Sequence, residues 1–473
     1  MSLNQKNEIY LKSLSKEENI IDHQKNSNKE KNTLSKPNMI VGIIQINSND
    51  NKRKRIINSY ENSRKEKNKS LSKGQIGNEK EIKNCDIFIN DKKIKFDYYY
   101  DFPNEGKYTI KYIFKEILIS TSHIFSHCES LISLDLSNFN SENVVNMKHM
   151  FEGCTSLESL NLTKFYTGKA TSMKYMFKEC ESLTSLDLSC FNTENVISME
   201  DMLYNCKKLE HFDVSKFNTQ KLKDSSCMFF GCSSLKSLDL SNFSTQKVTN
   251  MCGMFYGCTS LISLDLSSFN THNVSNMAIM FENCVNLKHL NISNFNTNKV
   301  INMKSMFHKC KSLISLNLSN FKTEKLFNTS SMFSQCQSLI SLDISNFNTQ
   351  NVCDMGSMFL NCKCLTSMDL SHFNTESVES MEKMFCNCYS LISLDISNFN
   401  TKKVIDMKNM FKNCFSLSYL NLDLSKFIIY KTFFYEDTLL CNCNSLFYKY
   451  TLNFDKMLQN RDKSKKKKKK NKK

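Results

Sequence analysis

Hydrophobic and polar residues recur with a fixed period of 26 through most of this chain. The unit reads C-x-S-L-x-S-L-D-L-S-x-F-N-T-x-x-V-x-x-M-x-x-M-F-x-x, and a cysteine opens each copy. The cysteines that keep this register are Cys128, Cys154, Cys180, Cys206, Cys232, Cys258, Cys284, Cys310, Cys336, Cys362, Cys388 and Cys414. An unbroken register over so many copies predicts a solenoid of twelve stacked coils rather than one globular core.

Each unit contains two different periodicities. From Ser133 to Ser137, apolar and polar residues alternate, which predicts a short strand with Leu134 and Leu136 inside and Asp135 outside. The next apolar residues are spaced as on one face of a helical or 3₁₀ turn. They are Val144, Met147, Met150, Phe151 and Cys154. The predicted class is therefore an α/β repeat, a leucine-rich-repeat solenoid with one short strand and one short helical segment per coil. Met and Phe recur at fixed positions, and we interpret them as core.

The chain divides into five predicted regions. Residues 1–37 lack periodicity and are predicted to be disordered. Residues 38–120 contain β-like runs at 39–46, 87–96 and 108–114, which predict a small β-rich capping domain that seals the first coil. The solenoid itself is assigned to residues 121–427. The repeat becomes irregular over residues 428–458, which are predicted to form a C-terminal cap. Residues 459–473 are a polylysine tail.

Charge is distributed unevenly. The formal net charge is +16, but residues 1–84 carry 18 Lys/Arg against 10 Asp/Glu, and residues 461–473 carry ten against one. The middle of the chain is therefore close to neutral. Basic runs at 52–55 and 465–470 could serve as nuclear-import or nucleic-acid patches, but no aromatic residues interleave with them, so base stacking is not supported. We interpret them as a solvated linker and tail, and we predict no specific nucleic-acid partner.

The composition also bears on localisation and chemistry. No signal peptide and no stretch long enough to span a bilayer is visible, so we expect a cytoplasmic protein whose 21 cysteines are reduced. The cysteine ladder is interpreted as packing. The pairs Cys362/Cys364 and Cys386/Cys388 could form a thiolate zinc site, but the ladder members must face inward, so no metal or other cofactor is predicted. Nucleotide-binding and catalytic motifs are not found, and we predict that the chain is not an enzyme.

The outward strand row is the predicted partner-binding site. Its central position is acidic in eight coils, and stacked carboxylates repel one another unless a cation or a basic partner relieves them. Solenoids commonly bind partners on their concave strand surface. The residues of this row are Asp135, Asp187, Asp213, Asp239, Asp265, Asp343, Asp369 and Asp395. The alternative interpretation is a solvated face that keeps the strands soluble.

The unit S-L-x-S-L-D-L-S-x-F-N-T, followed by V-x-x-M-x-x-M-F-x-x-C, resembles the BspA-like leucine-rich repeats. More narrowly, it is similar to the 26-residue surface-protein repeat of mycoplasma, Listeria-type bacteria and protists. This resemblance implies a right-handed solenoid and, from the bacterial members, adhesion or host contact at the cell surface.

Three functions follow as alternatives. The first is a protein-interaction module that uses the concave strand face to bind a basic or repetitive partner. The second is a cell-surface adhesin or antigen of BspA-like type that reaches the surface without a signal peptide. The third is an anion- or nucleic-acid-binding protein that acts through its basic ends.

Overall fold

The computed structural model describes residues 37–70, 76–423, 426 and 441–443. Two compact units, Met1–Val196 and Ile197–Lys473, make up the chain. Most of the predicted N-terminal disorder, the C-terminal cap and the polylysine tail lie outside the described residues. No helix among the described residues is both long and apolar enough to cross a bilayer.

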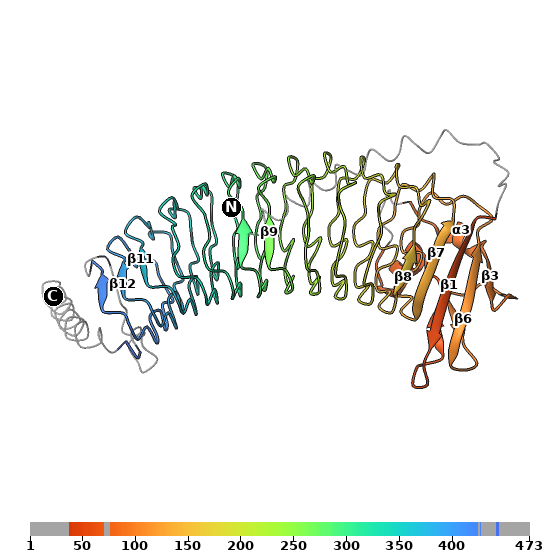
Figure 1. The fold of residues 1–473 in the computed structure, drawn as a ribbon, viewed down its shortest axis with the longest axis horizontal. Coiled ribbons are helices and arrows are strands. Elements are labelled where there is room, and N and C mark those ends of the chain that lie inside the picture. The colour runs from red at the N-terminus through yellow and green to blue at the C-terminus, as the bar shows by residue number, and fades with distance from the viewer. Residues whose placement is uncertain (1–36, 71–75, 424–425, 427–440, 444–473) are drawn as a thin grey trace, which may run out of the picture. The chain divides into compact units, whose positions relative to one another are not determined.

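The first unit begins with strands and short helices that precede the coils (Figure 1). In chain order they are β1 (Met39–Ile46), β2 (Arg53–Arg55), α2 (Tyr60–Glu66), α3 (Glu79–Lys83), β3 (Asp86–Ile89), β4 (Lys92–Ile94), β5 (Tyr99–Asp101) and β6 (Gly106–Ile113). Strands β1 and β6 cover two of the runs in which the sequence predicts strands. Ser59 caps α2, because its side chain accepts a hydrogen bond from the Asn62 N–H.

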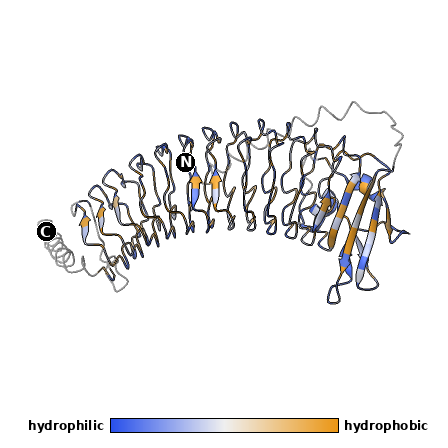
Figure 2. Ribbon diagram, viewed as in Figure 1, coloured by the Kyte–Doolittle hydropathy of each residue, from blue (hydrophilic) through white to orange (hydrophobic). Residues whose placement is uncertain are grey.

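The sheet of the first unit continues directly into the first coil. Its strand order is β4-β3-β6-β1-β7-β8, where β7 (Leu131–Asn138) and β8 (Ser159–Asn161) are the strands of the first two coils. Strand β1 pairs antiparallel with both β6 and β7. The edge that β7 would otherwise expose is thereby covered, as the end of a repeat stack requires. Figure 2 shows that the long strands of this sheet carry both hydrophobic and hydrophilic residues.

The coils of the second unit carry short parallel strands at the predicted position. They are β9 (Ser263–Asp265), β10 (His289–Asn291), β11 (Ser367–Asp369), β12 (Ser393–Asp395) and β13 (Tyr419–Asn421). β9 pairs with β10, and β12 pairs with both β11 and β13, in each case with equivalent residues of adjacent coils opposite each other. The predicted inward leucines are buried, including Leu264 and Leu266. The predicted repeat solenoid is therefore confirmed.

The helical segment of each coil takes a different form from the one predicted. In the coil around Phe255, alternate N–H groups donate to the next coil: Gly253 to Ala278 O at 3.0 Å and Phe255 to Met280 O at 2.9 Å. The intervening N–H of Met254 donates three residues back, to Met251 O. An α-helix needs four-residue hydrogen bonds from consecutive N–H groups. The segment is therefore a run of turns that the neighbouring coil stabilises.

Two residues of each run adopt the left-handed conformation, which also excludes a helix. Gly253 has φ of 60° and Gly257 has φ of 67°. The corresponding positions in other coils carry non-glycine residues at similar φ, among them Ile279 at 52° and Asn283 at 62°. Left-handed residues reverse the chain locally, so the apolar side chains between them still reach the interior.

The interior consists of ladders of identical residues. Every ladder Met from Met150 to Met410 has no exposed surface. Phenylalanines of adjacent coils stack nearly parallel, as in the Phe229–Phe255 and Phe255–Phe281 pairs, whose ring centroids are 5.7 Å apart. The predicted Met and Phe core is confirmed.

The cysteine ladder has a polar role in addition to packing. The thiol of Cys284 donates to Phe255 O at 3.0 Å, and the thiol of Cys310 donates to Phe281 O at 3.1 Å. The same contact recurs in both units, for example from Cys154 to Phe125 O at 3.1 Å. Each of these thiols therefore adds a second hydrogen bond to a carbonyl of the preceding coil that already accepts a backbone N–H, as Phe255 O does from Cys258.

We expect the ladder thiols to resist alkylation in the folded protein. Burial raises the pKa of Cys284 and of Cys362 to about 12, so almost no thiolate forms near pH 8. Cys364 lies two residues from Cys362 and is exposed, which makes it a matched control. After a short pulse of iodoacetamide, mass spectrometry should find Cys364 modified and Cys362 intact. Equal modification of the two would contradict this burial.

Candidate binding surface on the strand face

The eight predicted aspartates all occupy the same turn, at the end of the strand position. The side-chain Oδ1 of each accepts a hydrogen bond from the backbone N–H of the serine two residues later, at 2.7 to 3.0 Å. This is an Asx turn, in which a short side chain replaces a backbone acceptor. The sequence prediction placed these residues on the outside correctly but missed this structural role.

The turn also keeps the row charged. The Ser241 N–H lowers the pKa of the Asp239 carboxyl below its ordinary value, and the Ser267 N–H does the same for Asp265. Asp343 is affected in the same way by the Ser345 N–H. A hydrogen bond donated to the charged form favours that form. These exposed carboxylates are therefore ionised at neutral pH.

In the second unit the acidic residues fall into two runs of three consecutive coils. The first run is Asp213, Asp239 and Asp265, and the second is Asp343, Asp369 and Asp395. Asp239 and Asp265 line one shallow depression of about 400 Å³. Asp369 and Asp395 are opposite each other in the β11–β12 pair. Two coils with Asn291 and Asn317 at this position separate the runs.

Asparagine side chains of adjacent coils relieve the repulsion at several points of the row. Asn161 Nδ2 donates to Asp135 Oδ1 at 2.9 Å in the first unit, and Asn421 Nδ2 donates to Asp395 Oδ2 at 2.9 Å in the second. An amide donor beside a carboxylate contributes a charge-assisted hydrogen bond without adding charge. No such donor lies at the equivalent position beside Asp239, since both adjacent coils carry aspartate there.

Exposed isoleucines border the row, which the sequence analysis did not notice. In four coils of the second unit the residue directly before the strand serine is isoleucine and is about half exposed. They are Ile262, Ile314, Ile340 and Ile392. Their recurrence at the fifth position of the unit is visible in the sequence. The face therefore offers apolar contacts beside its negative charges.

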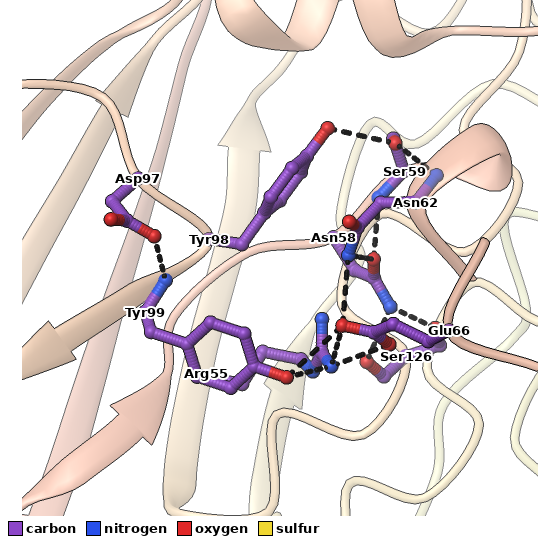
Figure 3. Close-up of polar contacts among 9 residues, drawn as sticks. All are labelled: Arg55, Asn58, Ser59, Asn62, Glu66, Asp97, Tyr98, Tyr99 and Ser126. Atoms are coloured by element: carbon purple, nitrogen blue, oxygen red, sulfur yellow. Dashed lines mark hydrogen bonds and ion pairs between the residues drawn. The ribbon is translucent and has the colours of Figure 1, made fainter.

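The basic run at 52–55 is not a solvated linker, contrary to the sequence interpretation. Its last three residues form β2, where Arg53 contacts Asp101 at 3.1 Å and Arg55 contacts Glu66 at 2.7 Å. Figure 3 shows the Arg55 guanidinium between Glu66 and Tyr99, close to the polar side chains of α2. These ion pairs join β2 to β5 and to α2.

The first cysteine pair of the alternative zinc site, Cys362 and Cys364, does not present both thiols to one ion. Cys362 is buried and its thiol donates to Phe333 O at 3.2 Å, whereas Cys364 is exposed. Two thiols that face different environments cannot bind one ion together. Within the described residues, a different set of side chains meets the spacing of a metal site: His123, His149 and Glu152.

These features define a class: a leucine-rich-repeat solenoid with a polar, acidic strand face. A family model described as "Mycoplasma protein of unknown function, DUF285" matches residues 119–238, 226–341 and 329–441. The chain belongs to this family, in agreement with the BspA-like repeat that its unit resembles.

Some solved structures are similar to the chain at low sequence identity. A leucine-rich repeat protein from Eubacterium ventriosum is 18% identical, with a TM-score of 0.29, over 56% of this chain and 72% of that one. The TLR13–ssRNA13 complex is 18% identical, with a TM-score of 0.23, over 64% of this chain and 48% of that one. No curated protein matches.

Proposed function

We propose that this chain is a non-enzymatic protein-interaction module whose strand face binds a basic protein segment. The observation that carries the proposal is the pair of three-coil aspartate runs in the second unit. Each carboxylate is held in place by a serine N–H, so it does not need to be ordered when a partner binds. Preorganised negative charge favours lysine and arginine side chains.

The spacing of the runs suggests the form of the partner. Strands stack at about 4.8 Å, so Asp265 and Asp343, three coils apart, are separated by about 14 Å. An extended peptide covers that distance in about four residues. A segment with two basic clusters at this separation, and with apolar residues that contact the bordering isoleucines, would match the face.

The uniformity of the row argues against acid–base catalysis. Catalysis by two carboxylates requires environments that push their pKa values apart. Here the pKa of each of Asp187, Asp239, Asp265, Asp343, Asp369 and Asp395 is shifted in the same direction, downward. Groups that titrate alike are suited to binding rather than to proton transfer.

A fourfold variant tests this proposal, because it removes the negative charge of four aspartates and keeps their Asx turns. In the fourfold variant Asp239→Asn, Asp265→Asn, Asp343→Asn and Asp369→Asn, the amide oxygen still accepts the serine N–H. We expect a synthetic peptide with two lysine clusters about four residues apart to bind this variant at least about tenfold more weakly. Isothermal titration calorimetry at two salt concentrations measures the effect and its ionic origin.

A matched control changes the same number of charges elsewhere. Glu142→Gln, Glu194→Gln, Glu324→Gln and Glu376→Gln neutralise exposed carboxylates at another position of the coil. Affinity for the peptide should change by less than about twofold in this control, because these side chains do not belong to the strand row and exposed charges are screened by salt. Equal losses in the two variants, or none in the first, would refute the proposed role of the row.

A further inference from the structure

A second cluster of polar side chains, away from the strand row, lies in the first unit. His123 and His149 are one repeat apart and have the same left-handed backbone, with φ of 61° and 59°. The His123 N–H donates to Lys148 O, and the His149 N–H donates to Lys174 O, both at 3.1 Å. Stacking of successive coils therefore places the two rings against each other, with centroids 4.3 Å apart.

Glu152 completes the cluster from the next turn. His149 Nδ1 and Glu152 Oε2 are 2.7 Å apart, and Glu152 is only 7% exposed. One potential ligand atom from each of His123, His149 and Glu152 lies within 4.8 Å of the other two. Two imidazole nitrogens and one carboxylate oxygen are a ligand set that binds zinc and similar divalent ions.

One nitrogen of this cluster has no partner. His123 is 6% exposed, and its Nδ1 is buried without a hydrogen bond among the described residues. A buried polar atom without a partner is destabilising, so such atoms are rare in folded proteins. In the tautomer protonated at Nε2, this unpartnered Nδ1 carries a lone pair that can bind a metal ion.

We propose that His123, His149 and Glu152 bind a divalent transition-metal ion of the zinc type, with water in the remaining position. The two rings are parallel to within 8°, and a bound ion lies in the plane of each imidazole. Binding therefore requires each imidazole ring to rotate about its Cβ–Cγ bond, so that the planes of the two rings meet at the ion. Lys67 and His127 are the other charged or titratable groups that act on Glu152, and neither supplies a ligand atom to the set.

Cobalt(II) is the probe that tests this site in the full-length, reduced chain. We expect one tightly bound ion with the visible absorption of nitrogen and oxygen ligands and without a thiolate charge-transfer band. Glu152→Gln retains the shape of the side chain but removes the carboxylate ligand. We expect cobalt(II) to bind at least about tenfold more weakly to Glu152→Gln and to His123→Asn than to the parent protein. His211→Gln and His289→Gln remove exposed histidines of the second unit and should leave the affinity unchanged.

Circular dichroism establishes that each variant is folded. If His123→Asn does not fold, Glu152→Gln and His149→Gln carry the test, since Glu152→Gln keeps the shape of the side chain and the His149 side chain is 23% exposed. Absence of a single tight site, a thiolate charge-transfer band, or unchanged affinity in Glu152→Gln would overturn the proposal. None of these results bears on peptide binding by the aspartate row, because the two sites share no residue.

Discussion

Replacing Phe255 with alanine should lower the free energy of unfolding of the second unit by about 3–5 kcal/mol. Phe255 has no exposed surface, and its ring stacks on Phe229 and Phe281 in the two adjacent coils. Removal of the ring leaves a cavity that weakens both interfaces at once. In a repeat protein the stability is a sum of such nearest-neighbour interfaces. Urea denaturation followed by circular dichroism measures the loss.

The matched control is Phe327→Ala, the same change at a phenylalanine that is 43% exposed. Substitutions at the surface usually change the free energy of unfolding much less than a core cavity does. For Phe327→Ala we expect a loss of about 1 kcal/mol or less. Similar losses for Phe255→Ala and Phe327→Ala would show that the phenylalanine ladder is not the core of the stack.

Replacing Gly42 with valine should separate the N-terminal sheet from the first coil, lowering the stability of the first unit by about 1–3 kcal/mol. A Cβ atom at Gly42 would lie 3.0 Å from Leu134 Cδ2 and 3.2 Å from Leu131 Cδ2. The two further methyl groups of valine have no space between β1 and β7. Hydrogen exchange of the β1 and β7 amides measures the effect.

Gly42→Ala is the control for this prediction. Its single methyl meets the ends of two flexible leucine side chains and, at an ordinary contact distance of 3.4 Å, the Ser133 carbonyl oxygen, so exchange in β1 and β7 should change much less than in Gly42→Val. Exchange in Gly42→Val that equals that of the parent protein would contradict the close packing of β1 against the first coil.

The repeat and its core could be predicted from sequence because identical residues must meet when coils stack. Met254, Phe255 and Cys258 are buried as their spacing predicts. The run of turns could not be predicted from the same spacing, because turns with left-handed residues also bring every third or fourth side chain inside. A partial signal was present: glycine or asparagine recurs directly before the ladder cysteine, as at Gly257 and Asn283.

The candidate sites differ in how far the sequence reveals them. The outward direction of Asp239 and Asp265 follows from strand alternation, but their hydrogen bonds to serine N–H groups depend on the turn geometry. The His123–His149–Glu152 cluster was missed because it needs residues one repeat apart to be compared across coils. The spacing of 26 between the two histidines was the available signal.

The most direct test of the account is to identify which carboxylates a basic partner contacts. A carbodiimide joins a lysine amine to a carboxylate only where the two are in contact, and mass spectrometry locates the bond. With the two-cluster lysine peptide, we expect cross-links to Asp239 and Asp265 and to Asp343 and Asp369. Cross-links confined to carboxylates outside the row, such as Glu324 and Glu376, would contradict the assignment of the strand face as the binding surface.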